Sequence, residues 1–164
     1  MHRVASRHSL LGFRWANEHG PAPFRWSGNI RDGPTISQSG EAPRMLTAAE
    51  ADELANQWIE AWNDHDLERI LRHYADDVVF SSPFIQKIGT SPSGAIFGTI
   101  ALREYFTAAL ARYPTLTFRL HAVFRGIDSV TLLYESVNGL VAAETMILNQ
   151  QHQVSRVLAQ YDKL

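Results

Sequence analysis

The sequence contains no cysteine among its 164 residues, and no apolar run approaches the roughly 20 residues needed to cross a bilayer. The first absence excludes disulfide bonds, thiolate metal sites and a cysteine nucleophile, and it leaves the redox compartment open. The second predicts a protein without a membrane-spanning segment. We therefore expect a soluble chain with no membrane partner, and we expect it in the cytoplasm.

Several catalytic and binding motifs are also missing. The sequence has no GxSxG, P-loop or Rossmann glycine pattern, so serine hydrolysis, phosphate binding and dinucleotide binding have no support. His65, His73 and His152 fall at a predicted joint, a helix end and a turn, and no two histidines share one face at metal-ligand spacing. We expect neither a metal nor a cofactor.

Charge divides the sequence at Met45. Residues 1–44 hold six arginines and three acidic residues, are rich in proline, glycine and serine, and show no periodic apolar pattern. Residues 45–164 hold nine basic and fourteen acidic side chains, which makes a poor surface for nucleic acid. We expect one globular domain over residues 45–164, preceded by a disordered leader over residues 1–44.

Residues 1–44 allow two further interpretations. They could form an arginine-rich targeting peptide, although they lack a secretory apolar core and their proline and glycine content disfavours an amphipathic helix. Translation could instead begin at Met45, directly before a helix start signal, which would make the upstream residues a start-site artefact. N-terminal sequencing of the protein distinguishes these interpretations.

Two amphipathic helices are predicted between Thr47 and Tyr74. Thr47 and Glu50 form a capping box, which fixes the start of the first helix. This helix ends near Asn63, and Asp66 can cap the second. Apolar residues recur every three or four positions; they are Leu54, Trp58, Ala61 and Trp62, then Leu67, Ile70, Leu71 and Tyr74.

A strand, a loop and a third helix follow. Residues 78–80 switch to strand spacing, and residues 83–98 are rich in serine, proline and glycine but carry apolar anchors. We expect a long loop there, of the kind that often covers a site. Thr99 can cap a third helix, which ends at Tyr113-Pro114. Its expected buried face comprises Leu102, Tyr105, Phe106, Ala109 and Leu110.

An antiparallel meander is predicted for the rest of the chain, with strands over residues 115–124, 130–137, 140–149 and 154–161. Asn138-Gly139 is a strong signal for a two-residue type I′ turn, because both central residues of that turn need a positive φ. Such a turn places Leu133 opposite Glu144 and Glu135 opposite Ala142, so that both glutamates share a face.

Both faces of this hairpin are mostly apolar, so neither is expected to be simply solvated. One face should cover the helices and a pocket, and the other should meet a partner subunit. We therefore expect a homodimer built on the sheet.

Four phrases carry a family resemblance: AWNDHDLERIL, YADDVVFSSP, GTIALREYF and AAETMIL. With the order of elements over residues 46–162, they resemble the nuclear-transport-factor-like superfamily, and within it the SnoaL-like polyketide cyclases and the ketosteroid isomerases. The resemblance implies an α+β fold, a cone-shaped (cystatin-like) barrel in which three N-terminal helices pack on a curved antiparallel sheet. One such fold hosts isomerases, cyclases, dehydratases, epoxide hydrolases and non-enzymatic modules.

The similarity to the ketosteroid isomerases implies where that family's catalytic groups would fall. Trp58 stands at the position of an oxyanion-hole tyrosine, and Phe106 at that of the tyrosine that supports it. Ser82, directly before a proline, stands at the position of the general-base aspartate. Glu144 stands at the position of a protonated aspartate that donates to the oxyanion. One acid is retained while the base and the phenol are replaced, so we do not expect ketosteroid isomerisation itself.

Glu144 is the main catalytic candidate. It lies in a largely apolar strand between Ala143 and Thr145, where burial should raise the pKa of its carboxyl group. A neutral acid there could donate to a carbonyl, and an ionised one could act as a base near neutral pH. The alternative is a carboxyl group that only satisfies a neighbouring Trp or Tyr. His121 is a second, weaker candidate for a general base.

Aromatic side chains supply the expected ligand-binding surface. Trp58 either lines the pocket or belongs to the core, and Tyr74 either aims its hydroxyl into the cavity or lies half-buried under the Asp76-Asp77 turn. Trp62 is assigned to the core. The expected substrate-binding residues are Trp58, Tyr74, Phe80, Ser82, Phe84 and Phe106.

We expect a protein that binds a small, mostly apolar organic ligand. As an enzyme it would be a cofactor-independent isomerase, cyclase or dehydratase that uses Glu144 for proton transfer or oxyanion stabilisation. The alternative is a non-catalytic ligand-binding or dimerisation module with the same fold. A cavity of several hundred Å³ with Glu144 on its wall favours ligand chemistry, whereas an interior filled by Trp58, Trp62 and Phe106 favours the module.

Overall fold

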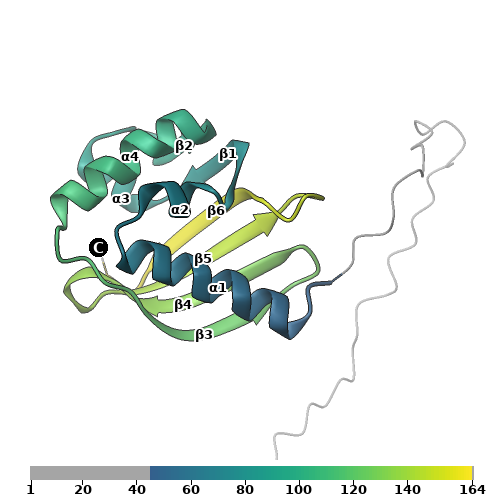
Figure 1. Ribbon diagram of the computed structural model, residues 1–164. Helices are drawn as coiled ribbons and strands as arrows, with labels where there is room; N and C mark the ends of the chain where they lie inside the picture. The colour runs from purple at the N-terminus through teal and green to yellow at the C-terminus, as the bar shows by residue number, and fades with distance from the viewer. Residues whose placement is uncertain (1–44, 164) are drawn as a thin grey trace, which may run out of the picture. The chain divides into compact units, whose positions relative to one another are not determined.

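The computed structural model describes residues 45–163, and these residues fold into a curved six-stranded sheet with four α-helices beside it (Figure 1). The predicted leader, residues 1–44, lies outside the described residues. The α+β class is confirmed, but four α-helices are present where three were expected, because residues 83–88 also form a helix. The strands are β1 (Tyr74–Ser81), β2 (Ala95–Phe97), β3 (Arg119–Arg125), β4 (Ser129–Glu135), β5 (Val141–Leu148) and β6 (Val154–Tyr161).

The strand order is β2-β1-β6-β5-β4-β3. Neighbouring strands run antiparallel except for β1 and β6, which run parallel, so the expectation of a wholly antiparallel sheet is wrong at that one pairing. The parallel pair joins the first strand of the chain to the last. It therefore adds β1 and β2 to the β6 edge of the meander.

The capping box is present as predicted at the start of α1 (Ala48–Asn63). The Thr47 hydroxyl accepts from the Glu50 amide at 3.2 Å, and a Glu50 carboxylate oxygen accepts from the Thr47 amide at 2.8 Å. Asp66 caps α2 (Leu67–Leu71) by accepting from the Arg69 amide at 3.0 Å. Both predicted starts are confirmed because each depends on residues that are close in the chain.

The second helix is shorter than predicted. Tyr74 was expected at the end of this helix, but it is the first residue of β1 and pairs with Val154 of β6. The Val154 amide donates to the carbonyl oxygen of His73 at 2.8 Å. A strand about eighty positions further along the chain thus takes the hydrogen bonds that would have extended the helix.

Residues 83–98 were predicted as one loop, and they contain regular structure instead. They hold α3 (Pro83–Ile88) and β2, and β2 pairs with β1. Ser82 caps α3 and Pro83 occupies its first turn, while Gly89 ends it with a φ of 84°. α4 (Gly98–Arg112) follows β2 directly and has no side-chain cap, so the predicted start at Thr99 is wrong.

A bulge sets the register of the β4–β5 hairpin. Asn138 and Gly139 have φ values of 58° and 69°, as a type I′ turn requires, within the short η1 segment (Val137–Gly139). However, the Ser136 amide donates to the Leu140 carbonyl at 2.7 Å, so Ser136 and Val137 together face Leu140. The predicted register is therefore wrong by one residue.

A second irregularity lies in β3. The pairing with β4 shifts between Leu120 and Ala122, which leaves His121 as an extra residue. Side chains after His121 therefore change faces, so that Phe124 lies on the opposite face from the one that regular alternation from Phe118 would give it, and it is 58% exposed. His121 itself lies near Glu135, with its Nε2 atom 3.9 Å from that carboxylate.

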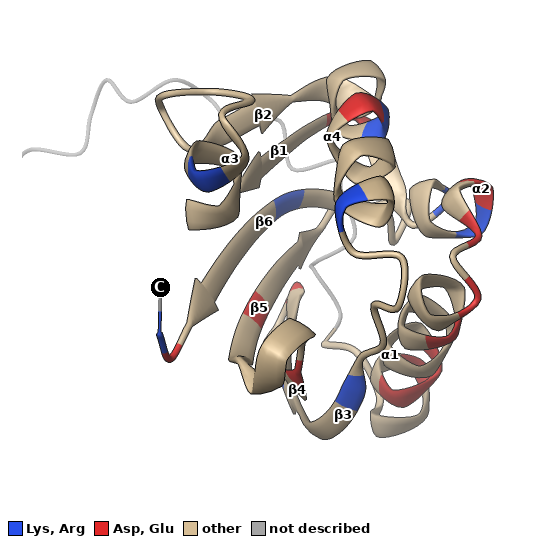
Figure 2. Cartoon of the chain, turned by 90° about the vertical axis from the view of Figure 1, so that its left-hand side faces the viewer, with Lys and Arg blue, Asp and Glu red and all other residues tan. Residues whose placement is uncertain are grey.

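Apolar side chains from α1, α4 and the inner face of the sheet form the core. Charged residues lie mainly on the helices, whereas the strands carry few (Figure 2). Within residues 45–163, no helix is long and apolar enough to cross a membrane. β5 carries one charged residue, Glu144, and this carboxyl group faces the core.

The end of α1 is fastened to the chain before β3 by side-chain hydrogen bonds. The Asn63 amide group donates to the Phe118 carbonyl at 3.0 Å and accepts from the Phe118 amide at 2.6 Å. The ring Nε2 of His65 lies 2.8 Å from the Leu116 carbonyl oxygen. These contacts hold Leu116 and Phe118 against the core without any strand pairing at that point.

We predict that Asn63→Ala lowers the free energy of unfolding by about 1–3 kcal/mol, because it leaves both backbone groups of Phe118 without their partner. Chemical denaturation followed by circular dichroism measures this change. Gln57→Ala, which removes one exposed hydrogen bond of the same helix, should change stability by less than about 0.5 kcal/mol. Equal effects of the two substitutions would contradict the role assigned to Asn63.

Candidate functional site

Glu144 lies in the middle of β5 and is 2% exposed. Leu132 and Ala159 are its direct neighbours in β4 and β6. Two tyrosines are its diagonal neighbours, because Tyr134 of β4 and Tyr161 of β6 both pair with Ala142, two residues before Glu144. The small Ala142 side chain leaves room for both phenol rings to lean toward the carboxyl group.

The two oxygens of Glu144 differ in their surroundings. Oε2 accepts a hydrogen bond from the Tyr134 hydroxyl at 2.8 Å, whereas Oε1 is buried and has no hydrogen-bond partner within residues 45–163. Burial raises the pKa of Glu144 from 4.5 to about 7, and the bond from Tyr134 opposes this rise only in part. Both protonation states are therefore populated near neutral pH.

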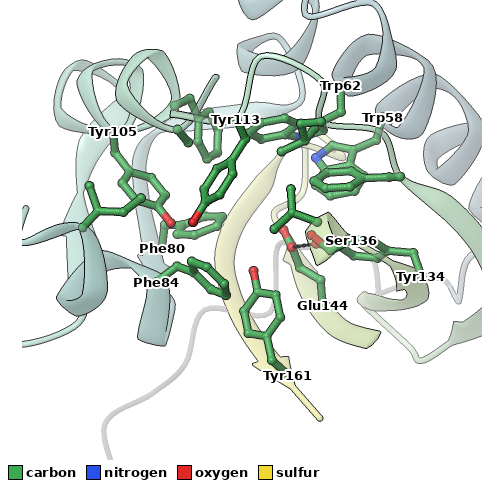
Figure 3. A pocket seen from close by; sticks show the side chains of 16 residues that line it. Trp58, Trp62, Phe80, Phe84, Tyr105, Tyr113, Tyr134, Ser136, Glu144 and Tyr161 are labelled. Carbon is green, nitrogen blue, oxygen red and sulfur yellow. Dashed lines mark hydrogen bonds between the residues drawn. The ribbon is translucent and has the colours of Figure 1, made fainter. Parts of the chain in front are cut away.

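A cavity adjoins Glu144 between the helices and the sheet (Figure 3). Its volume is about 50 Å³, which is room for about three or four water molecules. This volume is well below the several hundred Å³ expected for a ligand-binding cone. The lining is aromatic and aliphatic apart from tyrosine hydroxyls, Ser136, the indole groups and Glu144.

Packed aromatic rings explain the small volume. Trp58 stacks on Phe118 with ring centres 5.5 Å apart, and Trp62 meets Phe106 edge-on at 4.8 Å. The ring centres of Tyr134 and Phe118 lie 4.6 Å apart. These rings fill much of the interior, and their contacts hold one another in place.

Five of the seven predicted site residues line this cavity: Trp58, Phe80, Phe84, Phe106 and Glu144. Tyr74 and Ser82 do not. The Tyr74 hydroxyl is buried against α1, where it accepts from the Trp58 indole N–H at 2.9 Å. Ser82 is 4% exposed, and its hydroxyl accepts from the Phe84 amide at 3.2 Å as the cap of α3.

Trp58 and Tyr74 hydrogen-bond to each other, which limits what either can offer a ligand. Because the Trp58 N–H already has an acceptor, Trp58 offers the cavity a ring surface and no free donor. Tyr74 is the acceptor of that bond and is excluded from the lining. The position that resembles an oxyanion-hole tyrosine is therefore occupied by an apolar surface in this chain.

Several residues of the site are not among those predicted from the sequence. Tyr105 of α4, Tyr161 of β6 and Tyr113 also line the cavity, and Figure 3 shows the Tyr161 hydroxyl directed into it beside Glu144. Burial is the main cause that raises the pKa values of Tyr105 and Tyr161, so both phenols stay protonated and can donate. The apolar spacing had marked Tyr105 as buried, without showing which way its hydroxyl points.

Trp62 was assigned to the core and also lines the cavity. Its indole N–H is buried and has no acceptor in the described part of the chain. The predicted register lacked the bulge at Ser136 and Val137; it put Glu135 on the face of Glu144 and therefore Tyr134 on the opposite face, which is wrong. With the observed register, the spacing of Tyr134 and Glu144 places them side by side.

A second, more polar hollow of about 360 Å³ adjoins the first. It shares Tyr113, Ser136 and Val137 with the cavity, and Arg119 and Glu135, which form an ion pair, lie on its wall. Within residues 45–163, no cluster of three or more His, Asp or Glu side chains is arranged to hold a metal ion.

Known proteins resemble the chain in sequence and in fold. A family profile described as "SnoaL-like domain" matches residues 55–156. The crystal structure of a SnoaL-like protein of unknown function from Burkholderia thailandensis is 38% identical, covers 72% of this chain and 98% of its own, and superposes with a TM-score of 0.69. No functionally curated protein matches.

More distant structures share the fold alone. A protein of unknown function with a cystatin-like fold, from Methylobium petroleophilum, is 13% identical over 73% of this chain and 80% of its own, with a TM-score of 0.58. The epoxide hydrolase/cyclase-like enzyme SalBIII, which has a role in pyran ring formation in salinomycin, is 15% identical over 70% and 92%, with a TM-score of 0.56.

We predict that burial of Glu144 makes the fold less stable as the pH rises. Glu144 keeps its proton up to a pKa of about 7 in the folded state and only up to about 4.5 in the unfolded state. The contribution of protonated Glu144 to the free energy of unfolding is therefore complete below pH 4.5 and is lost as the pH rises through 7. Relative to Glu144→Gln, the wild type should lose up to about 3 kcal/mol of unfolding free energy. Urea denaturation between pH 4 and pH 8 measures this; a difference that does not vary with pH would contradict it.

Proposed function

Because the chain belongs to the SnoaL-like domain family, we propose that it binds the oxygen-bearing end of a small, mostly apolar organic ligand and transfers a proton beside that oxygen. The observation that carries this proposal is Glu144, a buried carboxyl group on the wall of an aromatic cavity with one oxygen held by Tyr134 and the other unpaired. A pKa of about 7 lets this group both take and return a proton near neutral pH.

The proposed step begins with ionised Glu144. Its Oε1 atom takes a proton from the carbon next to a ligand carbonyl, and the electrons of the broken C–H bond form the C=C bond of an enolate. The carbonyl oxygen gains the negative charge, which the protonated hydroxyls of Tyr161 and Tyr105 can stabilise by donation. Neutral Glu144 then returns the proton to the same or another carbon.

Tyr134 acts on Glu144 and not on the ligand. Its hydroxyl fixes Oε2, which leaves Oε1 as the oxygen that exchanges the proton. The same bond stabilises the ionised form and keeps the pKa from rising further. Tyr134 is therefore a positioning residue.

The cavity limits what can enter. About 50 Å³ admits a carbonyl group and a neighbouring carbon or two, so the rest of the ligand would lie toward the mouth or displace aromatic side chains. The proposed reaction class is accordingly a cofactor-independent isomerisation, cyclisation or dehydration. SalBIII supports this reaction class to a limited extent: it has the same fold and is an epoxide hydrolase/cyclase-like enzyme.

A non-catalytic ligand-binding or dimerisation module is the second candidate function. The small cavity favours it, because Trp58, Trp62 and Phe106 fill space that a bulky substrate would need. Position 82 also favours the module. The ketosteroid isomerases have a general-base aspartate there, whereas Ser82 caps α3. The two candidates differ in one measurable property, which is proton transfer to a bound ligand.

We also propose that the outer face of the sheet pairs with a second copy of this chain. Leu133, Val141, Ala143 and Ile147 point away from the core and are only partly buried in the single chain. Phe124 extends this surface, because the bulge at His121 turns its ring outward. An apolar face of this kind is typical of an interface.

The proposed proton transfer can be measured with cyclohexanone in D₂O. Wild-type protein should accelerate exchange of the α-protons, followed by proton NMR, and the rate should rise with pH through about 7 because the ionised acid is the base. Glu144→Gln should lower the catalysed rate by about 10²-fold. Glu135→Gln, on the other face of the same hairpin, is the matched control and should exchange at the wild-type rate.

Three results of this assay are decisive. Loss of exchange in Glu144→Gln, with the wild-type rate kept in Glu135→Gln, supports the enzymatic proposal. Equal rates in the wild type and Glu144→Gln would remove Glu144 from the mechanism. Binding of cyclohexanone without any exchange above the buffer rate would favour the non-catalytic module.

The proposed interface can be tested by placing a charge on it. Phe124→Glu should weaken self-association at least about tenfold in sedimentation equilibrium, because it places a charge in the proposed apolar interface. Ile100→Glu is the matched control, since Ile100 is 81% exposed and lies on α4, not on the strands of the proposed interface. A monomeric wild type, or equal weakening by both substitutions, would rule out an interface on the outer face.

A further inference from the structure

Trp58 and Trp62 lie one turn apart on α1 and both line the cavity, but their indole N–H groups differ in hydrogen bonding. The N–H of Trp58 donates to the Tyr74 hydroxyl at 2.9 Å. The N–H of Trp62 is buried without an acceptor in residues 45–163, although the residue is only 5% exposed. A buried donor without a partner is destabilising, so this one requires an explanation.

The second unpaired group lies at the same cavity. Among the described residues, the buried side-chain atoms without a partner are Trp62 Nε1 and Glu144 Oε1, and both residues line the 50 Å³ cavity. Trp62 belongs to the helical side and Glu144 to the sheet side (Figure 3). Two unsatisfied polar groups at one small cavity point to a polar partner that enters it.

The chemistry of the two groups defines that partner. An indole N–H can only donate, so Trp62 requires an acceptor. The Glu144 carboxyl group can donate when neutral and accept when ionised, and it is poised between these states. A carbonyl oxygen satisfies the tryptophan, whereas a hydrocarbon leaves both groups unpaired.

The Trp62 ring is also held in position. It meets Phe106 edge-on at 4.8 Å, lies 5.3 Å from Phe118, and contacts Trp58 at 5.9 Å. A ring enclosed in this way cannot turn its N–H toward another acceptor without moving its neighbours. The donor is therefore preorganised, at no further cost in side-chain entropy when a ligand arrives.

We propose that Trp62 is a ligand-binding residue whose indole N–H donates to a carbonyl oxygen, so that the site selects small ketones and related carbonyl compounds over hydrocarbons of the same shape. This inference rests on the site of the proposed function and deepens it. Trp62 would hold the oxygen while Glu144 acts on the adjacent carbon. The role differs from that of Trp58, which serves the fold through Tyr74.

The experiment compares cyclohexanone with methylenecyclohexane, in which a CH₂ group replaces the carbonyl oxygen. Protein with isotope-labelled indole nitrogens is titrated with each compound by NMR. The Trp62 indole signal, assigned by its loss in Trp62→Phe, should shift downfield with the ketone and not with the hydrocarbon. The Trp58 signal is the internal control, because its N–H keeps Tyr74 as acceptor.

Affinities from the same titrations give a second readout. Wild-type protein should bind the ketone about 3- to 10-fold more tightly than the hydrocarbon, and Trp62→Phe should remove most of that preference by weakening the ketone alone. Equal shifts of the Trp62 signal with both compounds would overturn the proposal. So would an equal loss of both affinities in Trp62→Phe, or ketone binding that leaves the signal unmoved.

The results also separate this inference from proton transfer by Glu144. If the ketone shifts the Trp62 signal but its α-protons do not exchange, the donor role stands and the enzymatic proposal falls. If Glu144→Gln abolishes exchange while Trp62→Phe leaves ketone affinity unchanged, the donor role falls and the enzymatic proposal stands. If Trp62→Phe does not fold, the wild-type titrations still test the donor role, because the Trp62 indole signal should shift with the ketone and not with the hydrocarbon.

Discussion

The site depends on one extra residue in the β4–β5 hairpin. Because Ser136 and Val137 together face Leu140, the register differs by one residue from that of a regular two-residue hairpin. A shift of one residue moves every side chain of a strand to the opposite face. In the observed register Tyr134 lies beside Glu144, whereas the regular register would have placed Glu135 on that face. The bulge thus gives the buried acid a phenol as its neighbour and keeps a second carboxylate out of the core.

The properties of Glu144 follow from that neighbour. Burial alone penalises the ionised form, and a second carboxylate would have penalised it further. One hydrogen bond from Tyr134 offsets part of the penalty, which leaves the pKa at about 7. The surrounding phenols are different, because burial keeps Tyr105 and Tyr161 protonated. The cavity therefore has one group that can change its charge near neutral pH, among neighbours that can only donate or accept hydrogen bonds.

Features that depend on nearby residues could be predicted from the sequence, and features that depend on distant pairing could not. The capping box at Thr47, the cap at Asp66 and the positive φ values at Asn138 and Gly139 are local. The end of α2 depends on β6, and both bulges depend on partner strands, so spacing within one segment could not show them. The burial of Glu144 was predictable from its apolar strand. Trp58 and Trp62 have the same apolar spacing, and only the fold shows which of them has an acceptor.

The small cavity and the proposed chemistry are consistent if the site recognises one end of its ligand. Proton transfer next to a carbonyl involves one C–H bond and one oxygen, and about 50 Å³ is enough for those atoms. Packed aromatic rings around them limit the water beside these atoms, which strengthens each electrostatic interaction there. A larger cavity would admit water to Glu144 and lower its pKa toward the ordinary value. The aromatic filling that favours a non-catalytic module is thus also the condition under which this carboxyl group remains poised for proton transfer.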